Sequence, residues 1–139
     1  PAGSALRAIA DVDRDRVRIG ISSKSAYDLF LSRSIQHAEL IRATDPNGAF
    51  QLILAGKVDV VAGVRQHRVA NAEKLPGSRV LDGRFMAIQQ ALGIPKGRDA
   101  GAKYLREFIE EVKASGLVAR AIEKAGTRGV SVAPAAAHQ

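Results

Sequence analysis

Apolar and polar positions alternate first at residues 17–21, where isoleucines are interleaved with arginine and glycine. Alternation of β-branched residues with period two is typical of a strand. The next apolar positions, Tyr27, Phe30 and Leu31, recur at helical spacing. The pattern therefore predicts a strand at 17–21 that passes through a serine-rich turn into a helix at 25–35.

The same succession of strand and helix is expected again further along. Strands are predicted at 38–43 and 58–62, and the helix between them begins at Asp45-Pro46. The aspartate accepts hydrogen bonds from free N–H groups of the first turn, and proline fits the first helical position because its missing N–H would be unpaired there. Gly56 is expected to end this helix, since glycine adopts the left-handed conformation without strain.

The later part of the chain is organised differently. A helix at 64–74, a short strand at 79–81 and an extended segment at 85–94 are followed by two helices over 98–126, separated by a break at 115–116. Strands that alternate with helices indicate parallel pairing with right-handed crossovers. The predicted fold class is α/β, a parallel-type sheet with flanking helices, plus the C-terminal helices.

The turns after two of the predicted strands are candidate walls of one pocket. Ligands of parallel sheets bind beyond the carboxyl ends of the strands. Ser22–Ser25 lie at one such end and Gly63–Gln66 at another. Free N–H groups at the start of the helix near Ser25 favour an anion such as carboxylate or phosphate. Alternatively, Ser23 or Ser25 only caps this helix.

Composition narrows the possible chemistry. Of the 139 residues, 46% are hydrophobic but only 4% are aromatic, so the core is expected to consist of Ile, Leu, Val and Ala. The chain contains no cysteine, which excludes disulfides, thiolate zinc sites and cysteine nucleophiles. No segment reaches the apolar length of a membrane span.

The formal net charge of +7 raises the question of nucleic-acid binding. However, the basic residues are spread along the chain with little aromatic interleaving, and over residues 11–18 arginines are mixed with aspartates. We therefore interpret the charge as a solubility feature and expect no nucleic-acid partner.

Motifs for catalysis are lacking in the sequence. The three histidines have no metal-binding spacing, and neither a G-x-S-x-G nucleophile turn nor a phosphate-binding G-x-x-x-x-G-K-[ST] loop occurs. Asp59, at a strand start, is interpreted as a partner of local backbone N–H groups rather than as an acid–base group. The sequence thus predicts no catalytic residue, no metal, no cofactor and no enzymatic activity.

Five stretches form a further pattern through their order and spacing. They are Val17 to Ile21 followed by Lys24-Ser25-Ala26; Ala49 to Asp59, with Leu54-Ala55-Gly56-Lys57-Val58-Asp59; Phe85 to Gly97, ending in Ile94-Pro95-Lys96-Gly97; Tyr104-Leu105 with Phe108-Ile109; and Lys113 to Gly116 leading into Ala121-Ile122. This pattern, over roughly residues 8–133, resembles the extracellular solute-binding proteins of bacterial ABC importers, in the family that carries polar amino acids (family 3).

The resemblance implies one lobe of a type II periplasmic binding protein, in which two α/β lobes joined by crossover strands clamp a ligand. Residues 17–82 would form the second lobe, after a lead-in segment at 1–16, and 83–97 would be the returning crossover strand. The helices over 98–126 would pack on a first lobe that this chain lacks, and 127–139 would form a tail.

The resemblance also assigns ligand-binding residues to the turn before the first helix. Ser25 matches the hydroxyl of the family's Gly-Thr or Gly-Ser pair, which receives the ligand carboxylate, and Ser23 lies beside it. Lys24 replaces the usual glycine of that pair, which would crowd a close backbone approach but adds a positive charge.

A second group of ligand-binding residues follows the third strand. The family often places an amine-binding aspartate where Val64 stands here, with Arg65 and Gln66 next to it. Without that carboxylate, the ligand is expected to be an acid lacking the amine, or a dicarboxylate. Alternatively, Arg65 is an ordinary surface residue of a helix.

These observations predict a non-enzymatic, substrate-binding component of an ABC-type importer that captures a small anionic or amino-acid-like solute in the cleft between two lobes. Its partners would be the solute and the ABC transporter permease, and its location periplasmic or extracellular. The alternative is an effector-sensing domain of the same fold in a transcription regulator or sensor kinase.

Two expectations concern the chain as a piece of a longer protein. Because it starts at Pro1, without an initiator methionine or signal peptide, it is expected to be a processed product or an excised part. Without the first lobe, the apolar faces of the C-terminal helices would be uncovered, so a homodimer through these helices, or their folding onto the chain's own lobe, is expected.

Overall fold

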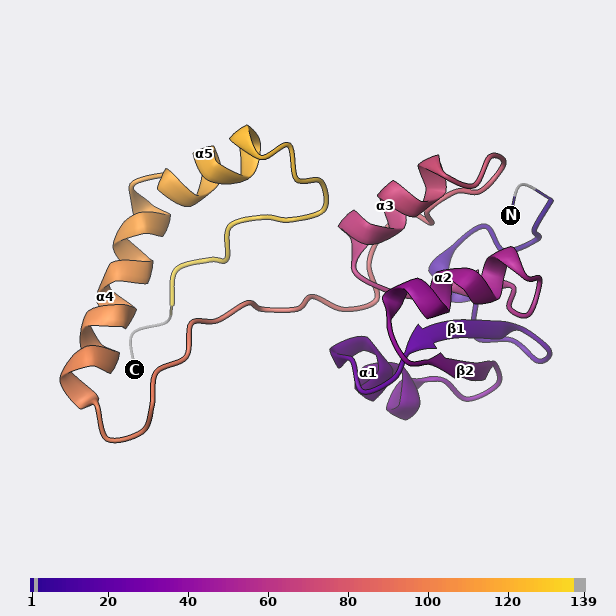
Figure 1. Ribbon diagram of the computed structural model, residues 1–139, viewed down its shortest axis with the longest axis horizontal. Coiled ribbons are helices and arrows are strands. Elements are labelled where there is room, and N and C mark those ends of the chain that lie inside the picture. The colour runs from indigo at the N-terminus through magenta and orange to yellow at the C-terminus, as the bar shows by residue number, and fades with distance from the viewer. Residues whose placement is uncertain (2, 137–139) are drawn as a thin grey trace. The chain divides into compact units, whose positions relative to one another are not determined.

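The computed structural model describes residues 1 and 3–136 (Figure 1). The chain falls into two compact units, Pro1–Ile88 and Gln89–Gln139. The first unit contains a sheet with helices, and the second contains a pair of helices.

A three-stranded parallel sheet with the order β2-β1-β3 organises the first unit. Its strands are β1 Arg18–Ser22, β2 Glu39–Ala43 and β3 Val60–Val61; the helices that follow them are α1 Ala26–Ser34, α2 Pro46–Leu54 and α3 Arg65–Glu73, and a short 3-10 helix, η1, spans Ile9–Asp11. Ile19 of β1 pairs with Leu40 on one side and with Val60 on the other. The α/β fold class, with a parallel sheet and flanking helices, is confirmed.

The core of this unit is built on the central strand β1. Ile19 and Ile21 are 1% and 0% exposed, and Tyr27 and Leu31 of α1 complete the buried cluster. The period-two alternation of β1 and the helical spacing of α1 thus bring their apolar positions together. Isoleucine and leucine dominate this cluster, in line with the aliphatic core expected from the composition, and one tyrosine joins them.

Gly20 allows α2 to lie close to β1. A Cβ atom at this position would stand 3.1 Å from Cγ2 of Val58 and 3.5 Å from the carbonyl oxygen of Ala49, the buried residue of α2. Any side chain at position 20 would therefore push the helix or the neighbouring strand away, which explains a glycine in the middle of a buried strand.

The predicted bounds of α2 are confirmed by their capping interactions. The side chain of Asp45 accepts a hydrogen bond from the N–H of Gly48 at 2.8 Å, and Pro46 occupies the first turn. Gly56, with φ of 66°, follows the helix end in the left-handed conformation.

Two predicted strands do not form. Residues 79–81 and 85–94 contain no strand, because the sheet ends at β3 and neither segment finds a neighbouring strand with which to build a ladder of hydrogen bonds. Phe85 and Met86 instead pack against the core, where the ring of Phe85 lies 6.0 Å from that of Phe30. The predicted crossover strand therefore begins with two residues that belong to the core of the first unit.

The third strand is also shorter than the predicted range of 58–62. Only Val60–Val61 form β3, although the N–H of Asp59 and that of Ala62 still donate to carbonyls of β1 at 2.9 and 3.0 Å. The hydrogen bonding at this edge therefore continues for one residue beyond the strand in each direction.

The second unit consists of α4 Asp99–Ala114 and α5 Leu117–Lys124, which pack together. Gly116, with φ of 74°, produces the predicted break between them. After α5 the chain has no helix or strand in its described part but returns to α4, where Nζ of Lys113 donates to the carbonyl of Pro134 at 2.7 Å. His138 and the rest of the predicted tail after residue 136 lie outside the described residues.

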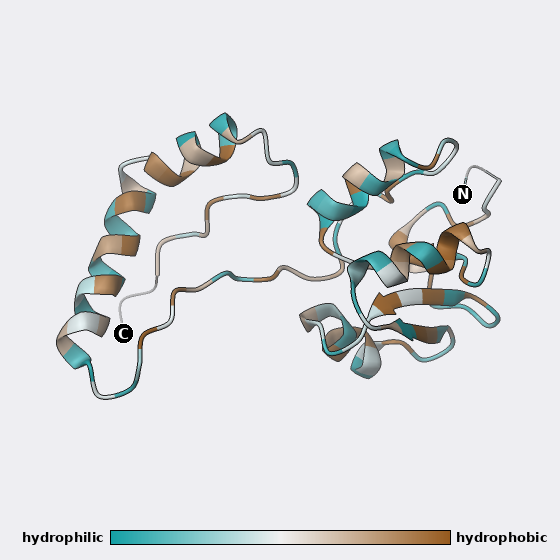
Figure 2. Ribbon diagram, in the orientation of Figure 1, coloured by the Kyte–Doolittle hydropathy of each residue, from teal (hydrophilic) through white to brown (hydrophobic). Residues whose placement is uncertain are grey.

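Hydrophobic residues recur along α4 and α5 between hydrophilic ones (Figure 2). Tyr104, Phe108 and Leu117 are 68%, 41% and 51% exposed, and the rings of Tyr104 and Phe108 stack at 6.3 Å. The two helices therefore present apolar surface, as the sequence predicts, while what covers that surface stays a prediction. No described helix combines the length and the hydropathy needed to cross a membrane.

Because β1 supplies the fully buried side chains, Ile21→Ala is expected to lower the free energy of unfolding by about 2–5 kcal/mol, and Ile21→Val by about 0.5–1.5 kcal/mol. Urea unfolding monitored by circular dichroism measures both. Equal, small losses for the two variants would show that β1 is not the centre of the core.

Candidate functional site

Three strand-to-helix junctions meet at the carboxyl edge of the sheet. They are residues 22–25 between β1 and α1, 43–46 between β2 and α2, and 62–64 between β3 and α3. The N–H of Ser23 donates to the carbonyl of Ala43 at 2.8 Å, which joins the first two junctions directly. Parallel order thus gathers three helix starts at one edge, the place where ligands of such sheets bind.

Ser25 caps α1. Its hydroxyl accepts a hydrogen bond from the N–H of Asp28 at 3.0 Å and donates one to the carbonyl of Ser22 at 2.8 Å. The capping alternative is therefore confirmed. The hydroxyl proton is already engaged, so a ligand carboxylate would have to compete with the Ser22 carbonyl for it.

Lys24 occupies the left-handed backbone region, with φ of 60°. This conformation suits glycine best, which fits the glycine expected at this position from the resemblance. The backbone N–H of Lys24 donates to Oδ2 of Asp28 at 2.8 Å, and its side chain is exposed. The Lys24 ammonium group is therefore exposed to solvent, while the backbone of the turn is held by its hydrogen bond to Asp28.

Asp28 is the buried charge that fixes this junction. Besides the Lys24 N–H, its carboxylate accepts hydrogen bonds from the Ser32 hydroxyl at 3.1 Å and from Nε of Arg42 at 3.0 Å, and Nη2 of Arg42 forms an ion pair with it. Burial acts to raise the pKa of Asp28, but the donors from Lys24, Arg42 and Ser32 together outweigh it, so the pKa lies below its usual value.

Arg65 and Gln66 form the first turn of α3, beside the third junction. Nη2 of Arg65 donates to the carbonyls of Gly83 at 2.5 Å and Leu81 at 3.3 Å, so this guanidinium holds the 81–83 loop against the helix. Gln66 is half-buried and makes no hydrogen bond among the described residues. No hydrogen bond or ion pair within the described part of the chain joins these two residues to Ser23, Lys24 or Ser25.

Arg68, one turn further along α3, was not identified by sequence reasoning. Its Nη2 donates to the carbonyl of Pro46 at 3.4 Å, while Nε and Nη1 are buried without a hydrogen-bond partner in the described residues. Desolvation by burial lowers the pKa of Arg68, and Tyr27 opposes this effect. In sequence, Arg68 is one of two arginines on a polar helix, so no signal distinguishes it from Arg65.

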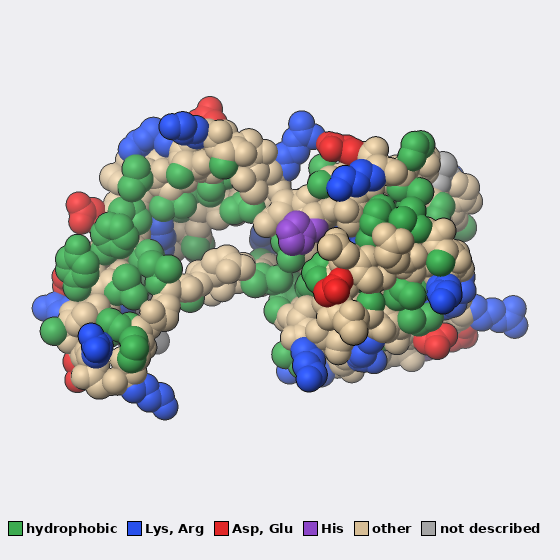
Figure 3. Space-filling model, viewed as in Figure 1, with side chains coloured by type: hydrophobic (Ala, Val, Ile, Leu, Met, Phe, Trp, Pro, Cys, Tyr) green, Lys and Arg blue, Asp and Glu red, His purple; other side chains and the backbone are tan. Residues whose placement is uncertain are grey.

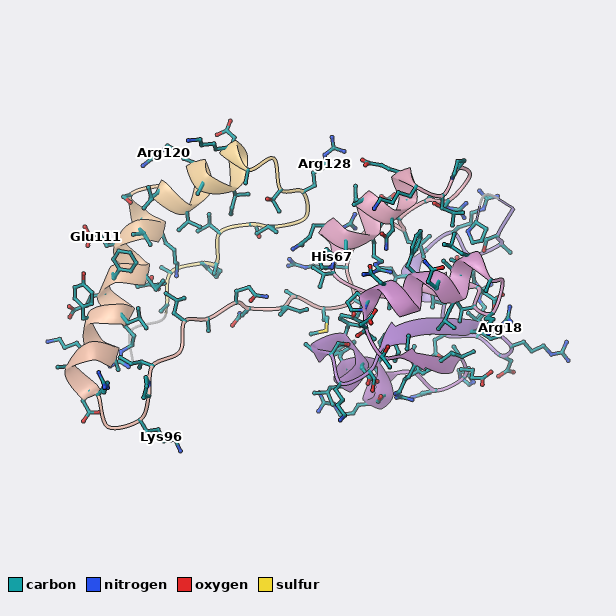
Figure 4. The ribbon with its side chains drawn as sticks, viewed as in Figure 1. Arg18, His67, Lys96, Glu111, Arg120 and Arg128 are labelled. Atoms are coloured by element: carbon teal, nitrogen blue, oxygen red, sulfur yellow. The ribbon has the colours of Figure 1, made fainter. Side chains whose placement is uncertain are left out.

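Asp59 lies at the opposite end of the sheet. Its carboxylate accepts hydrogen bonds from the backbone N–H of Arg18 at 2.8 Å and from its guanidinium at 2.9 and 3.0 Å. Figure 4 shows Arg18 at the amino end of β1, away from His67 at the start of α3. The prediction of local backbone partners for Asp59 is therefore wrong, because its one backbone donor, Arg18, lies on the neighbouring strand and is 41 positions away in sequence.

On the face of the first unit that Figure 3 shows, neither positive nor negative charge is concentrated. Lysine and arginine side chains are dispersed over the visible face and alternate with acidic ones (Figure 3). Within the described residues, no group of three or more His, Asp or Glu side chains could hold a metal ion.

Comparisons with known proteins bear on the fold. No protein-family model matches the sequence, and no curated protein matches it. A crystal structure of an ancestral cyclohexadienyl dehydratase is similar, with a TM-score of 0.52 and 21% identity over 86% of this chain. The chain spans half of that protein. At this identity the similarity concerns the fold, which is that of a lobe of the periplasmic-binding-protein type.

This comparison corrects one expectation from the sequence. The sequence predicts no enzymatic activity because it lacks a catalytic motif, yet the similar structure is that of an enzyme. One fold can serve binding proteins and enzymes alike, so the lack of a short motif does not exclude catalytic activity. The prediction that this chain has no enzymatic activity is therefore wrong, because a protein of similar fold is an enzyme.

Acid is expected to destabilise the first unit through its paired carboxylates. The pKa of Asp28 is lowered as described, that of Asp59 by the Arg18 side chain, and that of Asp13 by the N–H groups of Ala38 and His37. Each contribution is complete above the unfolded value of 3.8 and is lost as pH falls through the lower folded value. Urea unfolding between pH 7 and pH 2 should show this loss below about pH 4.

Asp28→Asn tests the contribution of Asp28, the buried carboxylate among these three. It is expected to lower the free energy of unfolding by about 1–3 kcal/mol at pH 7 and to flatten the acid dependence. Asp82→Asn, which removes an exposed carboxylate without a hydrogen-bond partner in the described residues, is the matched control. An unchanged acid profile in Asp28→Asn would contradict the role of this carboxylate.

Proposed function

We propose that this chain is the second lobe of the substrate-binding component of an ABC-type importer, and that it captures a small anionic or amino-acid-like solute. The observation that carries the proposal is the meeting of three helix starts at the carboxyl edge of a parallel sheet, in a fold of the periplasmic-binding-protein type. The other lobe, the first lobe of the full-length protein, would close over the solute; this chain spans half the length of the similar structure.

In this proposal the first junction provides the primary contacts. Ser23 and Ser25 offer hydroxyl groups at the start of α1, and Lys24 adds an exposed positive charge beside them. A carboxylate at this place is stabilised by the dipole of the helix and by the ammonium group together. The affinity therefore rests on charge rather than on apolar contact.

The third junction provides the second wall. Gln66 has unused donors and acceptors at the first turn of α3, whereas Arg65 shapes the wall by holding the 81–83 loop. Val64, at the start of this helix, supplies no carboxylate for a ligand amine. A solute with one or two carboxylates and no amine is therefore the preferred class, and the permease and a periplasmic or extracellular location complete the proposal.

A thermal-shift screen of the chain against organic acids, dicarboxylates, amino acids and neutral sugars tests this function. A solute that binds only the folded state raises the free energy of unfolding by about 2.7 kcal/mol at a hundredfold excess over Kd. Ser25→Ala is expected to reduce the ligand-induced rise, besides costing about 1 kcal/mol through the lost cap.

Ser25→Thr is the matched control, since threonine keeps both the hydroxyl and the cap. A ligand-induced rise that is selective for acids, reduced in Ser25→Ala and retained in Ser25→Thr supports the proposal. A chain that no solute stabilises would contradict it.

Dehydratase chemistry is the second candidate, and the similar enzyme structure is the observation that favours it. Loss of water from a hydroxylated cyclohexadiene produces an aromatic ring, so activity would appear as new ultraviolet absorbance. If this chain shares that activity, incubation with such a substrate should give absorbance that grows with protein concentration. Absorbance that matches the protein-free sample would exclude this candidate for the chain.

A further inference from the structure

We propose that Arg68 is an anion-binding residue at the carboxyl edge of the sheet, where its guanidinium receives a carboxylate or phosphate oxygen of a small solute. This inference deepens the proposed solute capture and rests on it. It also adds to Lys24 and Arg65, the cationic residues that the resemblance suggested, a residue that no comparison assigns.

The position of the guanidinium is the first argument. It extends from α3 back over Gly63, where a Cβ atom would stand 2.9 Å from Nε of Arg68. Nη2 reaches the carbonyl of Pro46 at the start of α2, and Tyr27 of α1 acts on the same group electrostatically. Arg68 thus connects the first turns of α3 and α2 at the edge where their strands end.

The lack of a compensating charge is the second argument. Two acidic residues of this edge have other partners, since Asp28 binds Arg42 and the Lys24 N–H, and Asp45 caps α2. Within residues 1 and 3–136, no carboxylate pairs with Arg68, and its Nε and Nη1 are buried without a partner. A buried, unpaired guanidinium is unfavourable, and an anion that supplied the missing oxygen atoms would remove this cost.

The shape of the group is the third argument. A guanidinium presents parallel N–H donors that match two oxygens of a carboxylate or phosphate, and such bidentate pairs are stronger than neutral hydrogen bonds. The side chain as a whole is only half-buried, so rotation about its terminal bonds brings these donors to a solute at the edge. With Val64 in place of a carboxylate, the favoured ligand carries oxyanions and no amine.

The experiment compares the melting temperatures of the full chain with succinate, inorganic phosphate and neutral succinamide at constant ionic strength. Succinate or phosphate, and not succinamide, is expected to raise the melting temperature of the unmodified chain. In Arg68→Met this rise should be lost, corresponding to binding weakened about tenfold or more. Larger responses to succinate than to phosphate would identify a carboxylate site, and the reverse order a phosphate site.

Two variants control for charge and for folding. Arg84→Met removes an equal charge from an exposed side chain that has no hydrogen bond in the described residues, and it should respond as the unmodified chain does. Arg68→Lys keeps the charge without the paired donors and should retain only part of the response. Should Arg68→Met not fold, the Nε–Hε resonance of Arg68 in the unmodified, 15N-labelled chain gives the answer, because it must shift on addition of the anion.

The outcomes separate this inference from the proposed function. An undiminished anion response in Arg68→Met, or an Arg68 resonance that anions do not move, overturns the role of Arg68 and leaves solute capture standing. Stabilisation by a neutral or zwitterionic solute but by no anion does the same. A chain that responds to no solute overturns both proposals.

Discussion

The structure of the first unit depends on parallel strands on both sides of β1. This strand is hydrogen-bonded to β2 and to β3, so its backbone is fully used and its two isoleucines can be buried almost completely. Parallel pairing forces each connection to return over the sheet, which places the starts of α1, α2 and α3 at the same edge. The candidate site is thus a consequence of the topology before any particular side chain is considered.

Two charged residues at this edge, Asp28 and Arg68, differ in how completely hydrogen bonds satisfy them. The carboxylate of Asp28 accepts hydrogen bonds from three donors: the Lys24 backbone, Ser32 of the same helix and Arg42 of β2. Its negative charge is therefore well compensated. Arg68 has one long hydrogen bond to a carbonyl and two buried nitrogens without partners in the described residues. The Asp28 charge holds the junction together, whereas in our proposal the Arg68 charge is completed by a ligand.

Local signals made much of the fold predictable, and long-range contacts set the limit. The alternation at 17–21, the Asp45-Pro46 start and the glycine at 116 each act within a few residues, so the sequence pattern placed the elements around them correctly. The predicted strands at 79–81 and 85–94 failed because strand formation needs a neighbour, and the apolar pattern of a segment does not say whether one exists.

In the candidate site, too, local interactions could be predicted from the sequence and long-range ones could not. Ser25 could be identified as a cap from its position before an apolar helical pattern, whereas the contacts of Arg65 and Arg68 are with residues 16 to 22 positions away, too far for any local pattern to indicate. The family resemblance suggested Arg65 as a ligand contact, and our proposal assigns that contact to Arg68 at the same edge of the sheet. Nor could the missing motifs exclude catalysis, since a related fold serves an enzyme.

The contact between Gly63 and Arg68 has a consequence for how this sequence can change over evolution. Gly63 has no positive φ that would require glycine; it is small because the guanidinium of Arg68 occupies the space where its side chain would be. The two positions are therefore coupled, and a lineage that loses the arginine is free to acquire a side chain at position 63. In an alignment of homologues, positions 63 and 68 are therefore expected to vary together.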